Sequence, residues 1–220
     1  MTHLDIELQQ LKAEMGNMLH TVLFQLEKAK EACMTGNTDL AREVIAREKR
    51  VNAYELKIDR DCENVIALFN PVAIDLRLVL STLKINSNLE RIGDFAEGLA
   101  KISLDQPNGF DPELAKLIRF DEIFNDAVEM LSDVKVAFEK ENSKLAASTL
   151  SKDDLLDDVN RQANGLIEGF IKQNPDKISQ ALDMISIVRK IERIGDHCSN
   201  IAEEIIFYIE AKVLKHQGKK

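Results

Sequence analysis

Apolar residues recur along most of the chain at alternating spacings of three and four, which gives an α-helix one buried face. In the last such stretch, the rhythm continues without an exception through Ile187, Ile191, Ile194, Cys198, Ile201, Ile205 and Tyr208. The pattern predicts six long helices, at about residues 4–34, 38–69, 72–103, 112–141, 144–172 and 175–214. No segment has the strict alternation that is typical of a strand. We therefore expect an all-α fold of six long antiparallel helices.

Glycine and proline residues mark the breaks between these patterns. Gly36 is expected to end the first helix in the left-handed conformation, and Thr38 to cap the second helix. The most turn-like stretch, residues 104–112, contains two prolines and an Asn-Gly step. We place a boundary there, which gives two domains, residues 1–107 and 108–220. Each is long enough to bury its own core, and we expect the two to depend on each other only modestly.

The string Glu-Arg-Ile-Gly-Asp occurs twice, at residues 90–94 and 192–196. The surrounding segments, residues 89–101 and 191–203, align without a gap at an offset of 102 (192 − 90). A repeat this long indicates two copies of one supersecondary unit rather than a short-period solenoid. The expected architecture is therefore two pseudo-symmetric three-helix bundles.

Acidic and amide side chains recur on one side of the two helices that carry this string. Helical spacing gathers them opposite the apolar stripe, so we expect them to face away from the core. They are Asn86, Glu90, Asp94 and Glu97 in the first half, and Glu192, Asp196, Ser199 and Glu203 in the second. The preceding helix of each half offers a second set: Glu48 with Asn52, and Asp153 with Asp157, next to Asp154 and Asp158.

These acidic faces have two interpretations. Most charged helix faces are simply solvated. Like charges at i and i+4, however, destabilise a helix by about 0.2–0.5 kcal/mol per pair, and a bound cation would remove that repulsion. In the second half, Ser151 is also a candidate cap for a helix that begins late, with Asp154 in a capping-box position and the other acids near the favourable end of the helix dipole. The repetition of the like-charge pair in both repeats favours a cation site.

The chemistry of these side chains restricts the metal and argues against catalysis. Carboxylate and amide oxygens suit Mg²⁺, Mn²⁺ or iron better than a tetrahedral structural zinc. No histidine follows a glutamate by three residues, as a ferritin-like di-iron site requires, and the motifs of nucleotide-binding loops, zinc proteases and serine hydrolases are absent. His197 follows Asp196, but helical neighbours point about 100° apart, which favours a histidine at the border of the site. We expect no catalytic residues.

Composition indicates which partners and which cellular compartment to expect. Acidic residues outnumber basic ones by 38 to 29, and the formal charge of −9 opposes binding to nucleic acid and anionic lipid. Cys33, Cys62 and Cys198 share no metal-ligand spacing, so we expect buried, reduced thiols. The N-terminus lacks the features of a secretory signal, and no window approaches the roughly 18 apolar residues of a membrane span. These features predict a soluble cytoplasmic protein.

Four segments carry a family resemblance. Residues 70–101 and 174–216, together with residues 47–59 and 152–162, resemble the repeat signatures of the PhoU family, regulators of bacterial phosphate uptake. The resemblance covers most of the chain. It implies a PhoU-like pair of three-helix bundles, a cytoplasmic location, a homodimer and negative regulation of the phosphate-starvation response. The implied partners are the ATPase subunit of a phosphate transporter and a sensor histidine kinase, so contact with membrane complexes would be only through partners.

The resemblance also implies metal binding, because family members carry paired E(D)xxxD motifs that hold multinuclear metal clusters. Carried over, the ligands are Glu48, Asn52, Glu90 and Asp94 in the first half and Asp153, Asp157, Glu192 and Asp196 in the second. Asn52 departs from the acid of the motif, so the first-half site is expected to be the weaker one. The metal is a divalent or trivalent ion, with iron, manganese, magnesium and zinc all open.

Two other functions are compatible with these features. One is an accessory role for a different type of phosphate transporter. The other is a carboxylate-metal phosphohydrolase, since clustered metals can generate hydroxide. Against the second, Arg91 and Arg193 are more simply interpreted as salt-bridge partners on the helix surface than as phosphate ligands. We therefore favour a non-enzymatic helical adaptor with metal-binding surfaces.

Overall fold

The computed structural model describes residues 1–214, and within this range the chain forms helices and no strands. The elements are α1 (His3–Thr35), α2 (Thr38–Phe69), α3 (Ala73–Leu104), α4 (Pro112–Leu117), α5 (Phe120–Glu139), α6 (Ser143–Thr149), α7 (Asp154–Gln173), η1 (Pro175–Lys177) and α8 (Ile178–Glu210). The all-α prediction is confirmed. The resembling segment that ends at residue 216 extends beyond the described residues.

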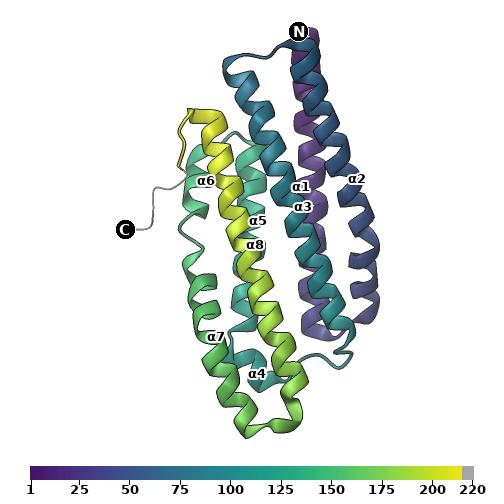
Figure 1. Ribbon diagram of the computed structural model, residues 1–220, viewed down its shortest axis with the longest axis vertical. Coiled ribbons are helices and arrows are strands. Elements are labelled where there is room, and N and C mark those ends of the chain that lie inside the picture. The colour runs from purple at the N-terminus through teal and green to yellow at the C-terminus, as the bar shows by residue number, and fades with distance from the viewer. Residues whose placement is uncertain (215–220) are drawn as a thin grey trace.

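The helices form two bundles that lie side by side along an elongated molecule (Figure 1). Helices α1, α2 and α3 make the first bundle, and α5, α6, α7 and α8 make the second. Helices α3 and α8 run in opposite directions along each other and join the bundles. The α2–α3 turn lies at one end of the molecule and the α7–α8 turn at the other (Figure 1). Two repeats of one helical unit are therefore present, as the sequence predicts.

In the first half, the helix limits agree with the sequence pattern to within a few residues. Gly36 ends α1 at φ 67°, as expected. A Cβ atom there would also lie 2.5 Å from the amide nitrogen of Gly109, so glycine is required for the close approach of the interdomain linker as well. The cap of α2 is Asn37 and not Thr38, because the Asn37 side chain accepts hydrogen bonds from the amides of Asp39 and Leu40.

In the second half, the prediction of three unbroken helices is wrong. The first predicted helix is divided at Arg119, which has a φ of 55°. Ile118 and Phe120 are both buried at this break. A continuous helix would turn two such neighbours about 200° apart, so the break allows both to reach the core. The second predicted helix is divided between Thr149 and Asp154, and α8 ends at Glu210 because Ala211 is left-handed.

The core is one connected cluster of buried apolar residues contributed by both halves. Cys33, Cys62 and Cys198 are buried and free, which confirms the prediction for the thiols. Burial raises the pKa of Cys33 and of Cys62 to about 12. Because the core is continuous between the halves, the separate folding of residues 1–107 and 108–220 stays a prediction.

Polar contacts also cross the seam between α3 and α8. The Nζ atom of Lys84 lies 3.1 Å from each carboxylate oxygen of the buried Glu204. His197 contacts Asn88 with 2.8 Å between Nδ1 and Oδ1, and because an amide oxygen only accepts, His197 donates. These contacts fix the register of the two helices that carry the repeated string. No described helix is both long and apolar enough to cross a membrane.

Candidate metal centres

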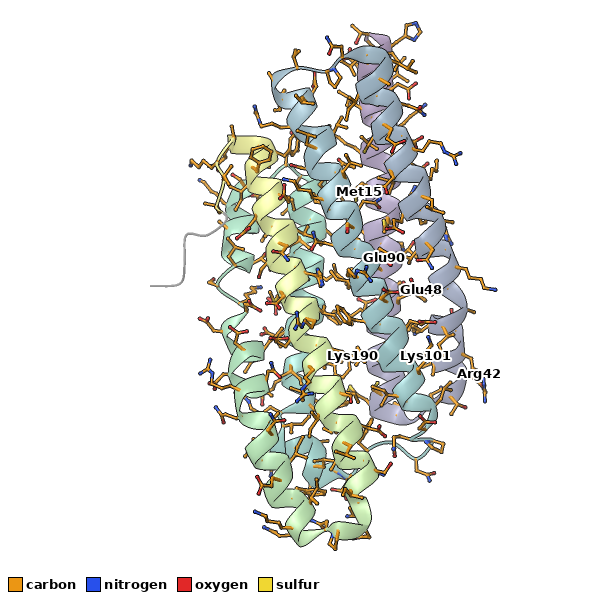
Figure 2. All side chains as sticks on the ribbon, viewed as in Figure 1. Met15, Arg42, Glu48, Glu90, Lys101 and Lys190 are labelled. Carbon is orange, nitrogen blue, oxygen red and sulfur yellow. The ribbon has the colours of Figure 1, made fainter. Side chains whose placement is uncertain are left out.

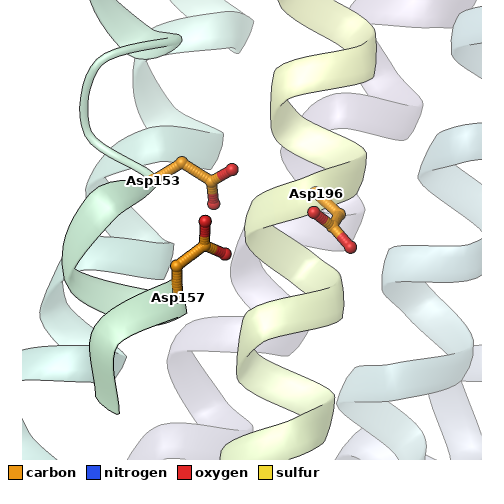
Figure 3. A group of neighbouring side chains, drawn as sticks. All are labelled: Asp153, Asp157 and Asp196. Atoms are coloured by element: carbon orange, nitrogen blue, oxygen red, sulfur yellow. The ribbon is translucent and has the colours of Figure 1, made fainter. Parts of the chain in front are cut away.

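The second-half centre is built by the start of α7 and the middle of α8. Asp153 is the N-cap residue of α7, Asp157 lies one turn further on, and Asp196 faces them from α8. Each offers a carboxylate oxygen within 4.8 Å of the other two, and Figure 3 shows Asp153 and Asp157 pointing from α7 toward α8, with Asp196 on α8 opposite them. The grouping that the sequence suggests for these three residues is therefore present.

Glu192 borders the same group, one turn before Asp196 on α8. Its pKa is raised, first because burial disfavours the charged form and then by the negative charges of Asp196 and Asp157. Asp158, in contrast, contacts Arg161 on the surface at 3.4 Å. Three of the four residues predicted for the second-half centre thus lie together, and Glu192 is their electrostatic neighbour.

Helix α7 begins late, as the capping alternative requires, but Ser151 does not cap it. The Ser151 hydroxyl donates to the carbonyl of Ser148, and α7 has Asp153 at its N-cap without a side-chain cap hydrogen bond. Asp154 and Asp157 occupy the first turn, where the helix dipole favours negative charge. The dipole accounts for part of the acidic cluster without a metal. It does not account for Asp196 and Glu192 on the other helix.

The first-half centre is built around Glu48, which α2 directs between α1 and α3. Only 6% of Glu48 is exposed. Its Oε2 accepts a hydrogen bond from Gln25 at 3.2 Å, and its Oε1 has no hydrogen-bond partner among the described residues. The pKa of Glu48 is raised to about 7, mainly by burial. The hydrogen bond from Gln25 lowers this pKa, and the negative charges of Asp94, Glu97 and Glu90 raise it further.

Glu90 and Asp94 of α3 are electrostatic neighbours of Glu48 of α2, and Figure 2 labels Glu48 and Glu90 on these two neighbouring helices. Among the described residues, only the second-half acids bring three carboxylate oxygens within 4.8 Å of one another. Burial and then the charge of Asp94 raise the pKa of Glu90. The Asn52 side chain is exposed. The three acidic residues predicted for the first half are thus electrostatic neighbours, while Asn52 lies at the outer edge.

The expectation that the acidic faces of α3 and α8 point away from the core is wrong for Asn86, which is buried because its side of α3 packs against α2 rather than water. Glu48 and Asp153, on the preceding helices, are buried as well. Asn86 donates to the Glu55 carbonyl at 2.9 Å and to Asp59 at 2.8 Å. Glu55 and Asp59 were not predicted, although they continue the helical face of Glu48 at i+7 and i+11.

The glycine of the repeated string makes room for the inner acid of each centre. A Cβ atom on Gly93 would lie 3.2 Å from Oε2 of Glu48. A Cβ atom on Gly195 would lie 2.8 Å from Oδ1 of Asp153 and 2.6 Å from a methyl group of Leu156. The string therefore combines two outward acids with a small residue that lets a third acid approach from the preceding helix. The repeated string is visible in the sequence, but the packing role of its glycine depends on the neighbouring helix and is not.

The other polar residues near the strings have structural roles. Arg91 contacts Asp94 at 3.0 Å, and Arg193 contacts Glu192 at 3.8 Å, which confirms both as salt-bridge partners on the helix surface. The His197 ring lies against Phe95, with 5.7 Å between ring centres, and burial lowers the pKa of the imidazole. His197 thus faces the α3–α8 seam.

The residues present fit a hard cation. Both centres offer carboxylate oxygens from two helices, and no cysteine lies in the second-half acid group. In the first half, a buried carboxylate oxygen without a hydrogen-bond partner costs free energy that a cation would offset. Oxygen-rich centres of this kind suit Mg²⁺, Mn²⁺ or iron, whereas zinc in structural sites prefers sulfur and nitrogen.

Known proteins resemble the chain over nearly its whole length. The sequence is 32% identical over 214 residues to the phosphate-specific transport system accessory protein PhoU homolog of Aquifex aeolicus, covering 97% of this chain and 96% of that protein. It is 31% identical over 212 residues to the phosphate-specific transport system accessory protein PhoU of Escherichia coli K12, covering 96% and 87%.

Solved structures agree. The crystal structure of PhoU from Pseudomonas aeruginosa matches with a TM-score of 0.89 and 29% identity, covering 94% of this chain and 99% of that one. The phosphate transport system regulatory protein PhoU from Streptococcus pneumoniae matches with a TM-score of 0.82 and 26% identity, covering 96% and 99%. The sequence model of the PhoU domain matches residues 15–103 and again residues 120–205. Two PhoU domains thus account for most of the sequence, and the chain belongs to the PhoU family.

Proposed function

We propose that this chain is a cytoplasmic accessory regulator of phosphate uptake. In the proposed role it keeps the phosphate-starvation response off when phosphate is plentiful, by linking the ATPase subunit of a phosphate transporter to a sensor histidine kinase. The observation that carries the proposal is the match of both halves to the PhoU domain. The Aquifex and Escherichia relatives, named as accessory proteins of phosphate-specific transport, support it.

The proposal includes a metal ion at each pair of acidic helices. In the second half, Asp153, Asp157, Asp196 and Glu192 would hold it, and in the first half Glu48, Glu90 and Asp94, with Asn52 at the edge. A bound cation would neutralise repulsion between carboxylates on α7 and α8, or on α2 and α3. It would thereby brace the helix pairs that form the long faces of the molecule. The second-half centre, where all four residues are acidic, is proposed to bind more tightly.

The arrangement favours an adaptor over a catalyst. A phosphohydrolase needs positioned cations to bind the phosphoryl group. The arginines of the repeated strings, Arg91 and Arg193, and Arg161 beside Asp157 instead pair with carboxylates of their own helices. Long helical faces joined by a continuous core offer extended surfaces for protein partners.

A reporter for the phosphate-starvation response tests the regulatory role. Deleting the gene should leave the reporter switched on in phosphate-rich medium, and the unaltered gene should restore repression. A reporter that stays off in the deletion strain would contradict the proposal.

Co-purification from the native organism tests the partners. We expect the ATPase subunit of a phosphate transporter and a histidine kinase to be recovered with the chain. Recovery of a phosphate transporter of another type would replace this proposal with the alternative accessory role.

Light scattering on the purified chain tests the proposed oligomeric state and should give the mass of a homodimer.

A further inference from the structure

Gln25 is an unexpected residue for its place in the core. It lies on the face of α1 that packs into the first bundle, and its exposed fraction is 0%. Its Nε2 donates to Oε2 of Glu48 at 3.2 Å and approaches the carbonyl of Val44 at 3.4 Å, while its Oε1 has no hydrogen-bond partner among the described residues. Burying an amide with one atom unsatisfied costs free energy. The position therefore needs an explanation other than core stability.

The second repeat shows what occupies the same place when the acid differs. The PhoU domain matches start at residues 15 and 120, an offset of 105 (120 − 15). At this offset the helix caps Asn37 and Asn142 coincide, and Glu48 corresponds to Asp153. Gln25 corresponds to Met130, which is equally buried on α5. The polar residue thus occurs in the repeat whose inner acid is a glutamate, and an apolar residue occurs where that acid is an aspartate.

The difference between the two acids explains the pairing. Glutamate has one more rotatable bond than aspartate, so a glutamate carboxylate is less fixed by its backbone and loses more rotamer freedom when it is held. Glu48 also lies in the middle of α2, whereas Asp153 lies at the N-cap of α7, where its short side chain is near the backbone. A donor from a third helix can hold one oxygen of the longer side chain in place.

We propose that Gln25 is a positioning residue of the first-half metal centre. By holding Oε2 of Glu48, it leaves Oε1 available as a ligand and makes α1 part of a centre whose other residues come from α2 and α3. This inference rests on the proposed metal binding. Partners that orient metal ligands through hydrogen bonds typically contribute about 10–100-fold to metal affinity.

The test uses the residue that the second repeat supplies. In a full-length background with Asp157→Ala and Asp196→Ala, which leaves the first-half centre, Gln25→Met is titrated with Mn²⁺ alone, and free Mn²⁺ is followed by electron paramagnetic resonance. We expect an affinity about 10–100-fold lower than in the same background with Gln25. Gln25→Leu should act in the same direction. As the matched control, Met130→Gln in a Glu90→Ala and Asp94→Ala background should leave the second-half affinity essentially unchanged, well short of the roughly 10–100-fold that the loss of an orienting hydrogen bond costs.

Stability without metal separates positioning from folding. Gln25→Met removes a buried amide with an unsatisfied oxygen but also takes the donor from Oε2 of Glu48, so these two effects oppose each other and the metal-free protein should melt close to the parent temperature. A fall in Mn²⁺ affinity together with nearly unchanged stability is the expected signature. An unchanged Mn²⁺ affinity in the folded Gln25→Met protein, or a fall only in proportion to lost stability, would overturn the role of Gln25. No Mn²⁺ binding in the background that retains Gln25 would overturn the first-half metal centre itself.

Discussion

The two halves build an acidic centre at the same place of the repeat by different means. In the first half, Glu48 lies in the middle of an unbroken helix, is buried, and is held by an amide from a third helix. In the second half, the helix is broken, and Asp153 and Asp157 lie at the start of the new helix. The repeated Glu-Arg-Ile-Gly-Asp string is common to both. The string supplies the acids of α3 and α8 at the same position of each repeat. The preceding helix, α2 or α7, determines whether the neighbouring acid is buried in a helix interior or stabilised at a helix start.

The difference has an electrostatic consequence. A helix N-terminus favours negative charge, so the break before α7 stabilises the carboxylates of the first turn of α7. Glu48 has no such support, and its pKa of about 7 means that a cation competes with a proton near neutral pH. We therefore expect the second-half centre to be the tighter one.

The largest effect is expected from removing the second-half ligands. Asp157→Ala with Asp196→Ala takes away two of the three grouped carboxylates, and metal affinity at that centre should fall by at least about 100-fold. Elemental analysis and calorimetry provide the measurement. Asp158→Ala, which removes a surface partner of Arg161, is the control and should bind metal normally. Unchanged metal content in the double variant would sink the assignment.

Glycine-to-alanine substitutions should change the free energy of unfolding according to how closely each glycine is packed. A methyl group on Gly195 meets Leu156 at 2.6 Å and Asp153 at 2.8 Å, so overpacking of about 1–3 kcal/mol should exceed the helix-propensity gain of about 1 kcal/mol. Gly93→Ala, with contacts of 3.2 Å, should be nearly neutral. Gly169→Ala meets nothing within 4 Å and should stabilise α7. Urea unfolding measures the stabilities of the three variants. Equal stabilisation by all three would refute the predicted order.

The raised pKa of Glu48 predicts a pH-dependent change in stability. In the metal-free protein, folded Glu48 keeps its proton up to about pH 7, while an unfolded glutamate loses it near pH 4.3, so folding is progressively disfavoured as the pH rises through this window. Glu48→Gln removes the penalty. The variant should be more stable than the parent by on the order of 1–3 kcal/mol at pH 8 and by much less at pH 5.

Chemical denaturation with a chelator present measures this difference. Glu90→Gln is the matched control, because Glu90 is less buried and should give a smaller gain. If the stability of the Glu48→Gln variant parallels that of the parent from pH 5 to pH 8, the pKa of Glu48 is not raised in the folded protein. The same variant should lose metal at the first-half centre, because the amide replaces a charged ligand.

The smallest effect is expected from restoring the missing acid. Asn52 corresponds to Asp157 at the repeat offset of 105, and its side chain is exposed. Asn52→Asp should raise the Mn²⁺ affinity of the first-half centre several-fold, since a surface charge adds only about 1 kcal/mol. Calorimetry in the Asp157→Ala and Asp196→Ala background isolates the effect. An affinity that falls or stays constant would place residue 52 outside the centre.

Much of the fold could be predicted because the apolar pattern and the glycine and proline breaks act locally. The break at Arg119 could not, because it contains no glycine or proline and arises from the burial of both Ile118 and Phe120. The break before Asp154 could be predicted only as the capping alternative, which places the cap at Ser151 instead of Asp153. The pairing of α2 with α3 and of α7 with α8 could be predicted, because acidic motifs recur on both helices of each pair. The burial of Glu48 and the contact with Gln25 depend on a third helix, which helical spacing within α2 does not describe.

The most direct test of two metal centres is a crystal structure of the full chain grown with Mn²⁺, with anomalous scattering recorded near the manganese absorption edge. We predict anomalous peaks between α7 and α8, beside Asp153, Asp157 and Asp196, and weaker peaks between α2 and α3 beside Glu48. Manganese-containing crystals with no peak at either helix pair would contradict the account.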